Sequence, residues 1–284
     1  MQPAVLFLSA ALFAHAPPRA ARVGRAALAM SSTGPSTVQS PPSARLSGLA
    51  LALDDGTRKS HSLAESTQFV TGFFRGIGTR EAFGALVCSL YYVYEAMEAE
   101  FDTAQDEAVR ALDFPSLRRR DALAADMAYW YGPNWRDVAR PSAATRIYVA
   151  RVREIARTEP RLLVGHMYTR YLGDLFGGQM MGGMARRSLN LPDGAGTAFY
   201  TFGEIPNAKA FIEGWYATLN ALPIDGAQQE AVVREANVVF ALNIALFDEL
   251  GGSAFHALWA LATRALADWD ARFDADWRAR RARA

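Results

Sequence analysis

Five glycines stand close together in one otherwise helical stretch, Tyr168 to Pro192, and an aspartate lies among them. The glycines are Gly173, Gly177, Gly178, Gly182 and Gly183. Each of them costs a helix interior roughly 0.5–1 kcal/mol relative to alanine. Because glycine has no Cβ, a bent helix of this kind can lay its backbone directly against a large flat ligand. Asp174 would then hold a carboxylate over that ligand.

The alternative reading of these glycines is a contact between two helices in a membrane, where glycines at i and i+4 let the backbones touch. The segment carries several polar side chains, namely Arg170, Asp174, Gln179, Arg186 and Arg187. These side chains make it too polar to cross a bilayer. We therefore prefer the interpretation of a flat ligand.

A histidine and a carboxylate form the second candidate group. His61 and Glu65 are four residues apart, so on a helix their side chains meet on one face. A carboxylate that accepts the Nδ1–H of an imidazole leaves Nε2 free to bind iron. Taken alone, such a pair is far more often a surface ion pair.

The other three of the four histidines are weaker candidates as ligands. His15 and His256 lie near the two ends of the chain. His166 lies seven residues before Gly173, about 10.5 Å along a helix axis, and we interpret it as structural.

The run YTRYLGDLFGGQ resembles the distal-helix signature of the haem oxygenases, and RTEPRLLVGHMYTRYLGDL extends this likeness. HSLAESTQF resembles the proximal-histidine helix of the same family, and the likeness covers about Leu49 to Leu250. It implies an all-α, single-domain helical bundle in which haem lies between a proximal helix and a glycine-rich, kinked distal helix. It also implies that haem b, O2 and electrons from reduced ferredoxin or another reductase yield biliverdin, carbon monoxide and ferrous iron.

The resemblance assigns roles to individual residues. His61 becomes the proximal ligand of the haem iron, oriented by Glu65, and Gly173 and Gly177 lie against the ring. Asp174 delivers protons through water, which keeps the reaction on the path to ring opening. The rest of its network matches the family in residue type and consists of Arg170, Tyr94, Tyr148 and Asn243. Core packing is the ordinary alternative for each aromatic residue.

The chain departs from the family where basic residues hold the haem propionates. The matching positions carry Asp54, Ile212 and Tyr216. Tyr168 keeps the family's propionate-contacting tyrosine. Arg58 is three residues before His61, on the same side of the helix, and we expect Arg58, with Tyr168 and Lys209, to replace the missing cations. Lys59 is rotated about 100° away and should matter less.

A second departure is Phe176, which takes the place of a small residue that the family has between the aspartate and the second glycine. This larger side chain could press on the haem pocket. Because of the missing cations and Phe176, the alternative function is that of a non-catalytic relative that binds or senses haem.

The amino-acid composition limits which other functions and kinds of site are possible. The chain has 284 residues, 51% of them hydrophobic, and a net charge of +1, which gives no reason to propose a nucleic-acid partner. The single cysteine, Cys88, excludes an intramolecular disulfide, and its apolar surroundings favour a buried thiol. That setting disfavours a thiamin-degrading enzyme of similar bundle shape, because such an enzyme needs a reactive cysteine.

Helical periodicity runs through most of the chain, with Pro and Gly as stops. We predict helices at residues 49–65, 67–75, 80–101, 118–131, 143–157, 159–188, 208–219 and 226–250. Only residues 199–202 could form a short strand.

The two ends have a different character. Residues 1–30 resemble a signal joined to a transit peptide, which indicates a plastid, with a mitochondrial leader or secretion as alternatives. Residues 31–45 form a Pro/Ser-rich linker without apolar surface to fold, residues 46–250 the domain, and residues 251–284 a further amphipathic helix. Charges interrupt that last helix too early for a transmembrane anchor, so it packs on the domain or lies on a membrane surface. A plastid enzyme of this kind would take electrons from ferredoxin and could pass its product to a bilin reductase.

Overall fold

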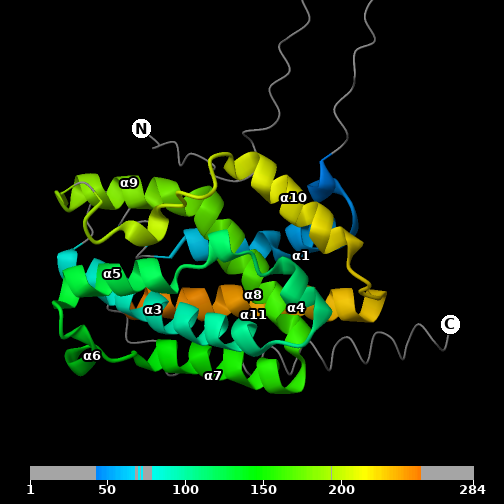
Figure 1. Ribbon diagram of the computed structural model, residues 1–284, viewed down its shortest axis with the longest axis horizontal. Helices are drawn as coiled ribbons and strands as arrows, with labels where there is room; N and C mark the ends of the chain where they lie inside the picture. The colour runs from blue at the N-terminus through cyan, green and yellow to red at the C-terminus, as the bar shows by residue number, and fades with distance from the viewer. Residues whose placement is uncertain (1–42, 68–69, 71, 73–78, 193, 251–284) are drawn as a thin grey trace, which may run out of the picture. The chain divides into compact units, whose positions relative to one another are not determined.

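A computed structural model describes residues 43–67, 70, 72, 79–192 and 194–250. Within these ranges the regular elements are all helical and no strand occurs, which confirms the predicted all-α class (Figure 1). The predictions for the leader 1–30 and the tail 251–284 lie outside the described residues. So do most of the linker 31–45 and most of the helix expected at 67–75.

Six long helices lie close to their predicted ranges. They are α1 (Gly48–Glu65), α3 (Arg80–Thr103), α5 (Arg120–Tyr131), α7 (Ala143–Thr158), α10 (Ala208–Ala221) and α11 (Gly226–Leu250). Sequence periodicity did not predict the short helices α4 (Glu107–Leu112) and α6 (Trp135–Val138) or the 3-10 turn η3 (Pro115–Leu117). Each of these is too short to display a helical repeat.

Side-chain caps explain where several helices begin. The hydroxyl of Thr79 accepts the backbone N–H of Ala82 at the start of α3, and Ser142 does the same for Thr145 at the start of α7. The C-terminus of α5 is set by Gly132, whose φ of 83° suits a residue without a Cβ.

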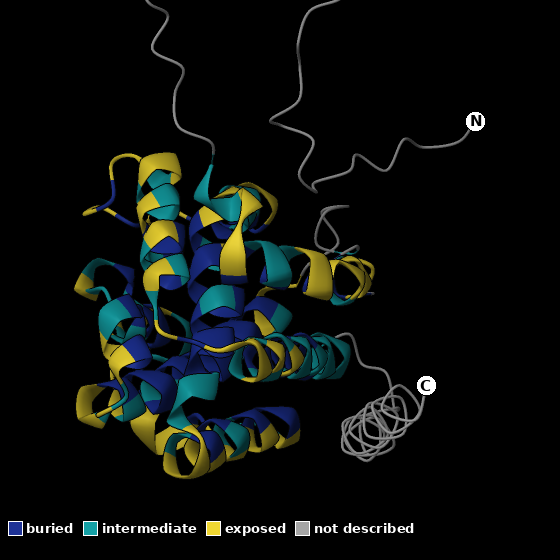
Figure 2. Ribbon diagram, turned by 90° about the vertical axis from the view of Figure 1, so that its right-hand side faces the viewer, coloured by how far each residue is buried: buried dark blue, intermediate teal, exposed yellow. Residues whose placement is uncertain are grey.

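The helices pack around one core. α1 lies along α11, and α3 packs against α5, α7 and α11 (Figure 1). Buried faces point inward and exposed faces outward, as the colours of Figure 2 show. The largest fully buried side chains include Trp215, Tyr94, Tyr148 and Phe83. Two of these, Tyr94 and Tyr148, were predicted as site residues, so the core and the candidate site share side chains.

The glycine-rich stretch is the main departure from the predicted elements. Instead of one helix over 159–188, it comprises a 3-10 turn η4 (Pro160–Leu162), α8 (Leu163–Met167), two π-helical turns η5 (Tyr168–Leu172) and η6 (Asp174–Gly178), and α9 (Gln179–Ser188). In Figure 1 the chain changes direction between α8 and α9. π-helical turns inside a helix often occur at functional sites. We refer to α8, η5, η6 and α9 together as the distal segment.

Two further expectations differ from the structure. Residues 198–200 form a 3-10 turn, η7 (Ala198–Tyr200), so the short strand considered for residues 199–202 is wrong. The end of the expected linker is ordered, because Ala44–Leu46 form the 3-10 turn η2, whose preceding Ser43 bonds Glu213 of α10. No helix among the described residues is long and apolar enough to span a membrane.

Candidate functional site

Asp174, the first residue of η6, accepts hydrogen bonds from two other predicted site residues. The Tyr94 hydroxyl of α3 donates to its Oδ2. Arg170, one turn earlier, lies with Nη2 3.4 Å from Oδ1 and 3.3 Å from Oδ2. The spacing of four residues within the distal segment brings these two charges together.

Arg170 links the distal segment to α11. Its Nη1 donates to Oδ1 of Asn243 over 3.0 Å, and its guanidinium carbon lies 5.5 Å from the centre of the Tyr94 ring. The side chain is only 8% exposed. Three elements that are distant in sequence therefore fix one carboxylate.

Burial and the neighbouring charge have opposite effects on the pKa of Asp174. Burial raises the pKa of this carboxyl, whereas Arg170 and the hydrogen bond from Tyr94 lower it, and the net shift is upward. For Arg170, burial lowers the pKa and Asp174 raises it, and the net shift is also upward, so the guanidinium stays charged. A carboxyl with a raised pKa and fixed donors suits proton transfer near neutral pH.

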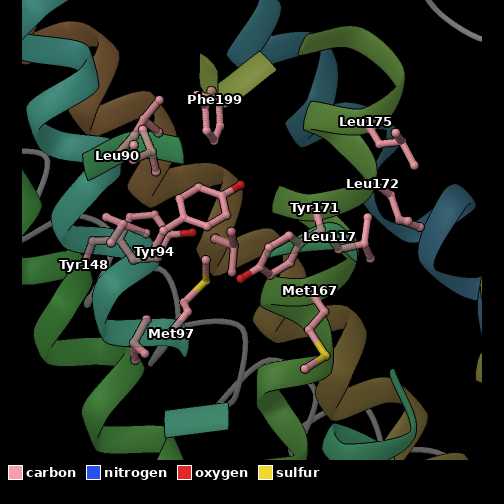
Figure 3. Packing of buried hydrophobic residues seen from close by; sticks show 14 of the residues in the cluster. Leu90, Tyr94, Met97, Leu117, Tyr148, Met167, Tyr171, Leu172, Leu175 and Phe199 are labelled. Carbon is pink, nitrogen blue, oxygen red and sulfur yellow. The ribbon is translucent and has the colours of Figure 1, made fainter. Parts of the chain in front are cut away.

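Aromatic packing holds Tyr94 in place. Its ring is fully buried and meets the Tyr171 ring edge-on at 5.1 Å and the Phe199 ring at 5.4 Å. Figure 3 shows these three residues together in the core with Tyr148. The position of the hydroxyl that bonds Asp174 is therefore set by the core.

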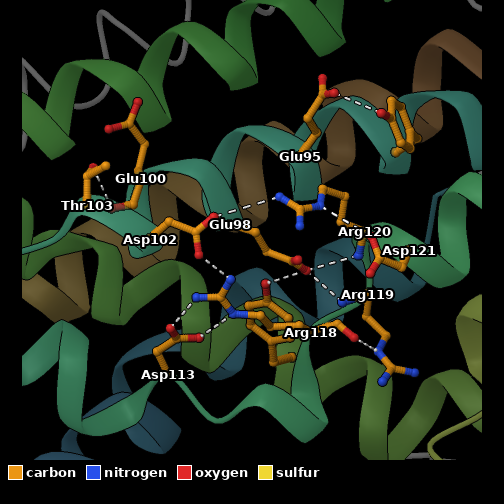
Figure 4. Close-up of polar contacts among 12 residues, drawn as sticks. Glu95, Glu98, Glu100, Asp102, Thr103, Asp113, Arg118, Arg119, Arg120 and Asp121 are labelled. Atoms are coloured by element: carbon orange, nitrogen blue, oxygen red, sulfur yellow. Dashed lines mark hydrogen bonds and ion pairs between the residues drawn. The ribbon is translucent and has the colours of Figure 1, made fainter. Parts of the chain in front are cut away.

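A buried acid that bonds Tyr171 was not singled out in the sequence analysis. Glu98 of α3 accepts the Tyr171 hydroxyl at 3.3 Å and the backbone N–H groups of Arg119 and Arg120 at 2.6 and 3.0 Å (Figure 4). Burial raises the pKa of Glu98, although the two N–H groups lower it. Glu98 could have been predicted from the sequence, because it is a glutamate in an otherwise apolar helix face.

Tyr148 and His166 lie next to each other on the buried side of Arg170. Their rings are 5.6 Å apart and both are fully buried. Nε2 of His166 lies 3.0 Å from Oε1 of Glu235, which also accepts Nε of Arg151 at 3.0 Å. His166 thus has the setting expected of a structural histidine. Glu235, within an apolar stretch of α11, was missed.

Several buried polar atoms in this region have no protein partner within the described residues. They are the Tyr148 hydroxyl, Nδ1 of His166, Oγ1 of Thr169 and Nε of Arg170. Buried polar atoms are normally hydrogen-bonded, and ordered water commonly serves where protein does not. The surroundings of Arg170 therefore suit a chain of bound waters leading to Asp174.

The glycines of the distal segment divide into two sets. A Cβ built on Gly173 or Gly177 meets no atom within 4 Å, whereas a Cβ on Gly178 or Gly182 would lie 3.2 or 2.7 Å from Tyr200. The second set lets the segment pack against η7. The first set leaves a backbone surface open beside Asp174, as a flat ligand requires. Phe176 is 55% exposed and so does not fill the core.

His61 lies near the end of α1 with its imidazole 47% exposed. Nδ1 is 3.6 Å from Oε1 of Glu65, which is an ion-pair contact longer than a hydrogen bond, and the ring stands edge-on to Phe240 at 5.6 Å. Nδ1 thus faces the carboxylate, as expected. α1 and the distal segment both pack on α11, which supports both halves of the candidate site.

The basic residues near α1 are arranged differently from our expectation. Arg58 is 67% exposed and bonds Asp55 over 2.6 Å, with Asp54 at 3.6 Å. Lys209 lies exposed at the start of α10. Tyr168 is largely buried, and Thr57 of α1 lies near enough to its phenol to lower the pKa that burial raises. The cation that pairs most closely with Asp54 is Arg45, which the sequence analysis did not consider.

Comparison with known proteins identifies close relatives. The family model described as "Heme oxygenase" matches residues 47–249. The protein named "Heme oxygenase 1" of Synechocystis is 45% identical over 219 residues, which cover 77% of this chain and 91% of that protein. "Heme oxygenase" of the red alga Porphyra purpurea is 43% identical, covering 73% and 89%. The crystal structure of Synechocystis heme oxygenase-1 in complex with heme superposes with a TM-score of 0.70 at 44% identity, covering 78% of this chain and 100% of that chain.

Proposed function

The chain belongs to the haem oxygenase family, and from this premise we propose how its residues act. The protein is an oxidoreductase that binds haem and opens it to biliverdin, carbon monoxide and ferrous iron. Our proposal concerns the residues that hold haem, the residues that manage protons, the electron donor and the cellular site.

The open backbone at Gly173 and Gly177 fits a porphyrin ring, because no side chain stands in its place. His61 would hold haem from α1 through Nε2, since Nδ1 faces Glu65. Haem, when bound, supplies both the iron that activates O2 and the ring that is cleaved. The fit rests on two features of this chain, an accessible imidazole and a glycine surface beside the partly buried carboxylate of Asp174.

Asp174 is the residue to which we assign proton delivery. Its carboxylate oxygens are fixed by the Tyr94 hydroxyl and the Arg170 guanidinium, so it holds a water at its edge in one orientation. Asn243 fixes Arg170, and Tyr148 adds a buried hydroxyl to the same water-binding region. The geometry of Asp174 is the single observation that carries this proposal, because a binding protein without turnover has no need of it.

We assign the supply of electrons to reduced ferredoxin or another reductase, and the use of the product to a bilin reductase. The leader at residues 1–30 supports import into a plastid, with a mitochondrion as the alternative. Import of a tagged full-length chain into isolated plastids and mitochondria distinguishes the two.

The test of the activity is a haem titration of the apoprotein without oxygen, followed by reductant and air. We expect a histidine-ligated haem spectrum that gives way to biliverdin absorbance, with ferredoxin and its reductase supporting the conversion. Stable binding with no bilin from any donor would favour a haem sensor.

A further inference from the structure

The 3-10 turn η2 is fastened to the domain at several points. Glu213 of α10 accepts the Ser43 hydroxyl at 2.6 Å and the backbone N–H of Ala44 at 3.0 Å. Asn220, also of α10, donates to the Ala44 carbonyl at 2.7 Å and accepts the N–H of Ala50 at 3.0 Å. These bonds fix the backbone of Arg45 between α1 and α10.

The Arg45 side chain extends from η2 to Asp54 of α1 and is 33% exposed. Its Nη2 donates to Oδ1 of Asp54, the one hydrogen bond of this guanidinium to another described residue. Burial lowers the pKa of Arg45, while the pairing with Asp54 raises it and gives a net upward shift, so the guanidinium stays charged. Nε and Nη1 remain as donors for a second carboxylate.

Two tyrosines lie within electrostatic range of Arg45, namely Tyr168 of the distal segment and Tyr216 of α10. Burial raises the pKa of each phenol, so each keeps its proton and can donate it in a hydrogen bond. A charged guanidinium with unused N–H donors is a receptor for a carboxylate, and neutral phenols in the same region add no negative charge that would oppose it. Asp54, which by charge alone would repel a carboxylate, is neutralised here by Arg45.

This group lies on the same helix face as His61. Asp54 precedes His61 by seven residues, about two turns and 10.5 Å along α1. Arg58 shares this face, but it bonds Asp55 and is two-thirds exposed. The position of Arg45 therefore matches a ligand that is held at His61 and carries acid groups on one edge.

We propose that Arg45, held by the bonds of η2 to α10 and oriented by Asp54, binds a carboxylate of haem. This inference rests on the proposed function, because it takes haem as the ligand at His61. It replaces the expectation that Arg58 and Lys209 supply the cations. A residue from the segment preceding α1 thus completes the binding site.

The test compares haem with its dimethyl ester, which has the same ring and iron but no ionised carboxylates. Apoprotein is titrated with each ligand by absorbance, for the wild type and for Arg45→Gln, Arg45→Lys, Arg58→Gln and Lys59→Gln. Lys59→Gln is the matched control, because it removes one positive charge from exposed α1.

Arg45→Gln should weaken haem binding about tenfold, which corresponds to about 1.4 kcal/mol, and change ester binding less than about twofold. Arg45→Lys should recover part of the haem affinity, and Lys59→Gln should change neither. Equal losses for haem and ester would overturn the proposal, since they indicate a structural effect of η2. Unchanged haem affinity in Arg45→Gln would overturn it too, and a loss in Arg58→Gln alone would return the role to Arg58. If the wild type shows no histidine-ligated haem, the proposed function itself fails, which is a separate outcome.

Discussion

Replacing Tyr94 by phenylalanine removes one of the two groups that hold Asp174 and should shift the pH dependence of turnover. The Tyr94 hydroxyl, itself fully buried, bonds Oδ2 of the partly buried Asp174, and this bond lowers the pKa of a carboxyl that burial has raised. Without the hydroxyl, burial is opposed by Arg170 and more distant charge alone. The pKa of Asp174 should therefore rise further.

The size of the shift follows from the kind of bond. A hydrogen bond to a charged group contributes about 1.5–3 kcal/mol, and one pKa unit corresponds to about 1.4 kcal/mol. Removing the hydroxyl should therefore destabilise the ionised form of Asp174 by about 1.5–3 kcal/mol and raise its pKa further. Since turnover is assigned to the ionised carboxylate, the acid limb of the rate profile moves to higher pH.

The assay is the initial rate of biliverdin formation against pH, with haem saturating. The control is Tyr91→Phe, which removes a hydroxyl from the same helix, where it bonds Glu95 at 2.8 Å, outside the Asp174 network. Tyr94→Phe should move the acid limb and Tyr91→Phe should leave it in place. An unmoved limb in Tyr94→Phe, with haem bound normally, would refute the role of the Tyr94 bond.

The remaining predictions test the ligand, the glycine surface and a buried acid. His61→Ala should lose the histidine-ligated haem spectrum and regain it when imidazole is added. His166→Ala should keep the spectrum and lower the free energy of unfolding by about 1–3 kcal/mol. The reverse pattern would make His166 the iron ligand. Gly177→Val should fold normally, because its Cβ meets open space, yet bind haem at least about tenfold more weakly, which is about 1.4 kcal/mol. Gly182→Ala should cost the apoprotein about 1–3 kcal/mol in chemical denaturation, because its Cβ would lie 2.7 Å from an aromatic residue. Burial raises the pKa of Asp126 to about 6, so the folded state binds this proton more tightly than the unfolded state does. The free energy of unfolding should therefore fall by about 3 kcal/mol as pH rises from about 4 to 7. In urea titrations at several pH values, Asp126→Asn should lack this pH dependence.

The sequence located the central carboxylate and its partners because their relations are local or carried by the family likeness. Arg170 and Asp174 are four residues apart, so any helical geometry brings them together. The glycines predicted a bent helix, but not its π-helical turns at Tyr168–Leu172 and Asp174–Gly178, because glycine spacing alone does not distinguish i→i+5 from i→i+4 hydrogen bonding.

Arg45 escaped prediction for a physical reason. Its position depends on η2 bonding Glu213 and Asn220, which are roughly 170 residues away along the chain. A Pro/Ser-rich approach to the first helix gives no sign of such a contact. Arg58 was chosen by its spacing from His61; the structure pairs it with Asp54 and Asp55, and its role toward haem stays a prediction.

We expect Asp174 to serve turnover and not haem binding. Asp174→Ala, compared with the wild type, separates these two roles: haem affinity is measured by anaerobic titration, and biliverdin yield per bound haem is measured after reductant and air. Asp174→Ala should show an unchanged histidine-ligated spectrum, affinity within a fewfold of the wild type, and almost no biliverdin as the haem absorbance decays. A wild-type yield of biliverdin from Asp174→Ala would show that turnover does not need this carboxylate.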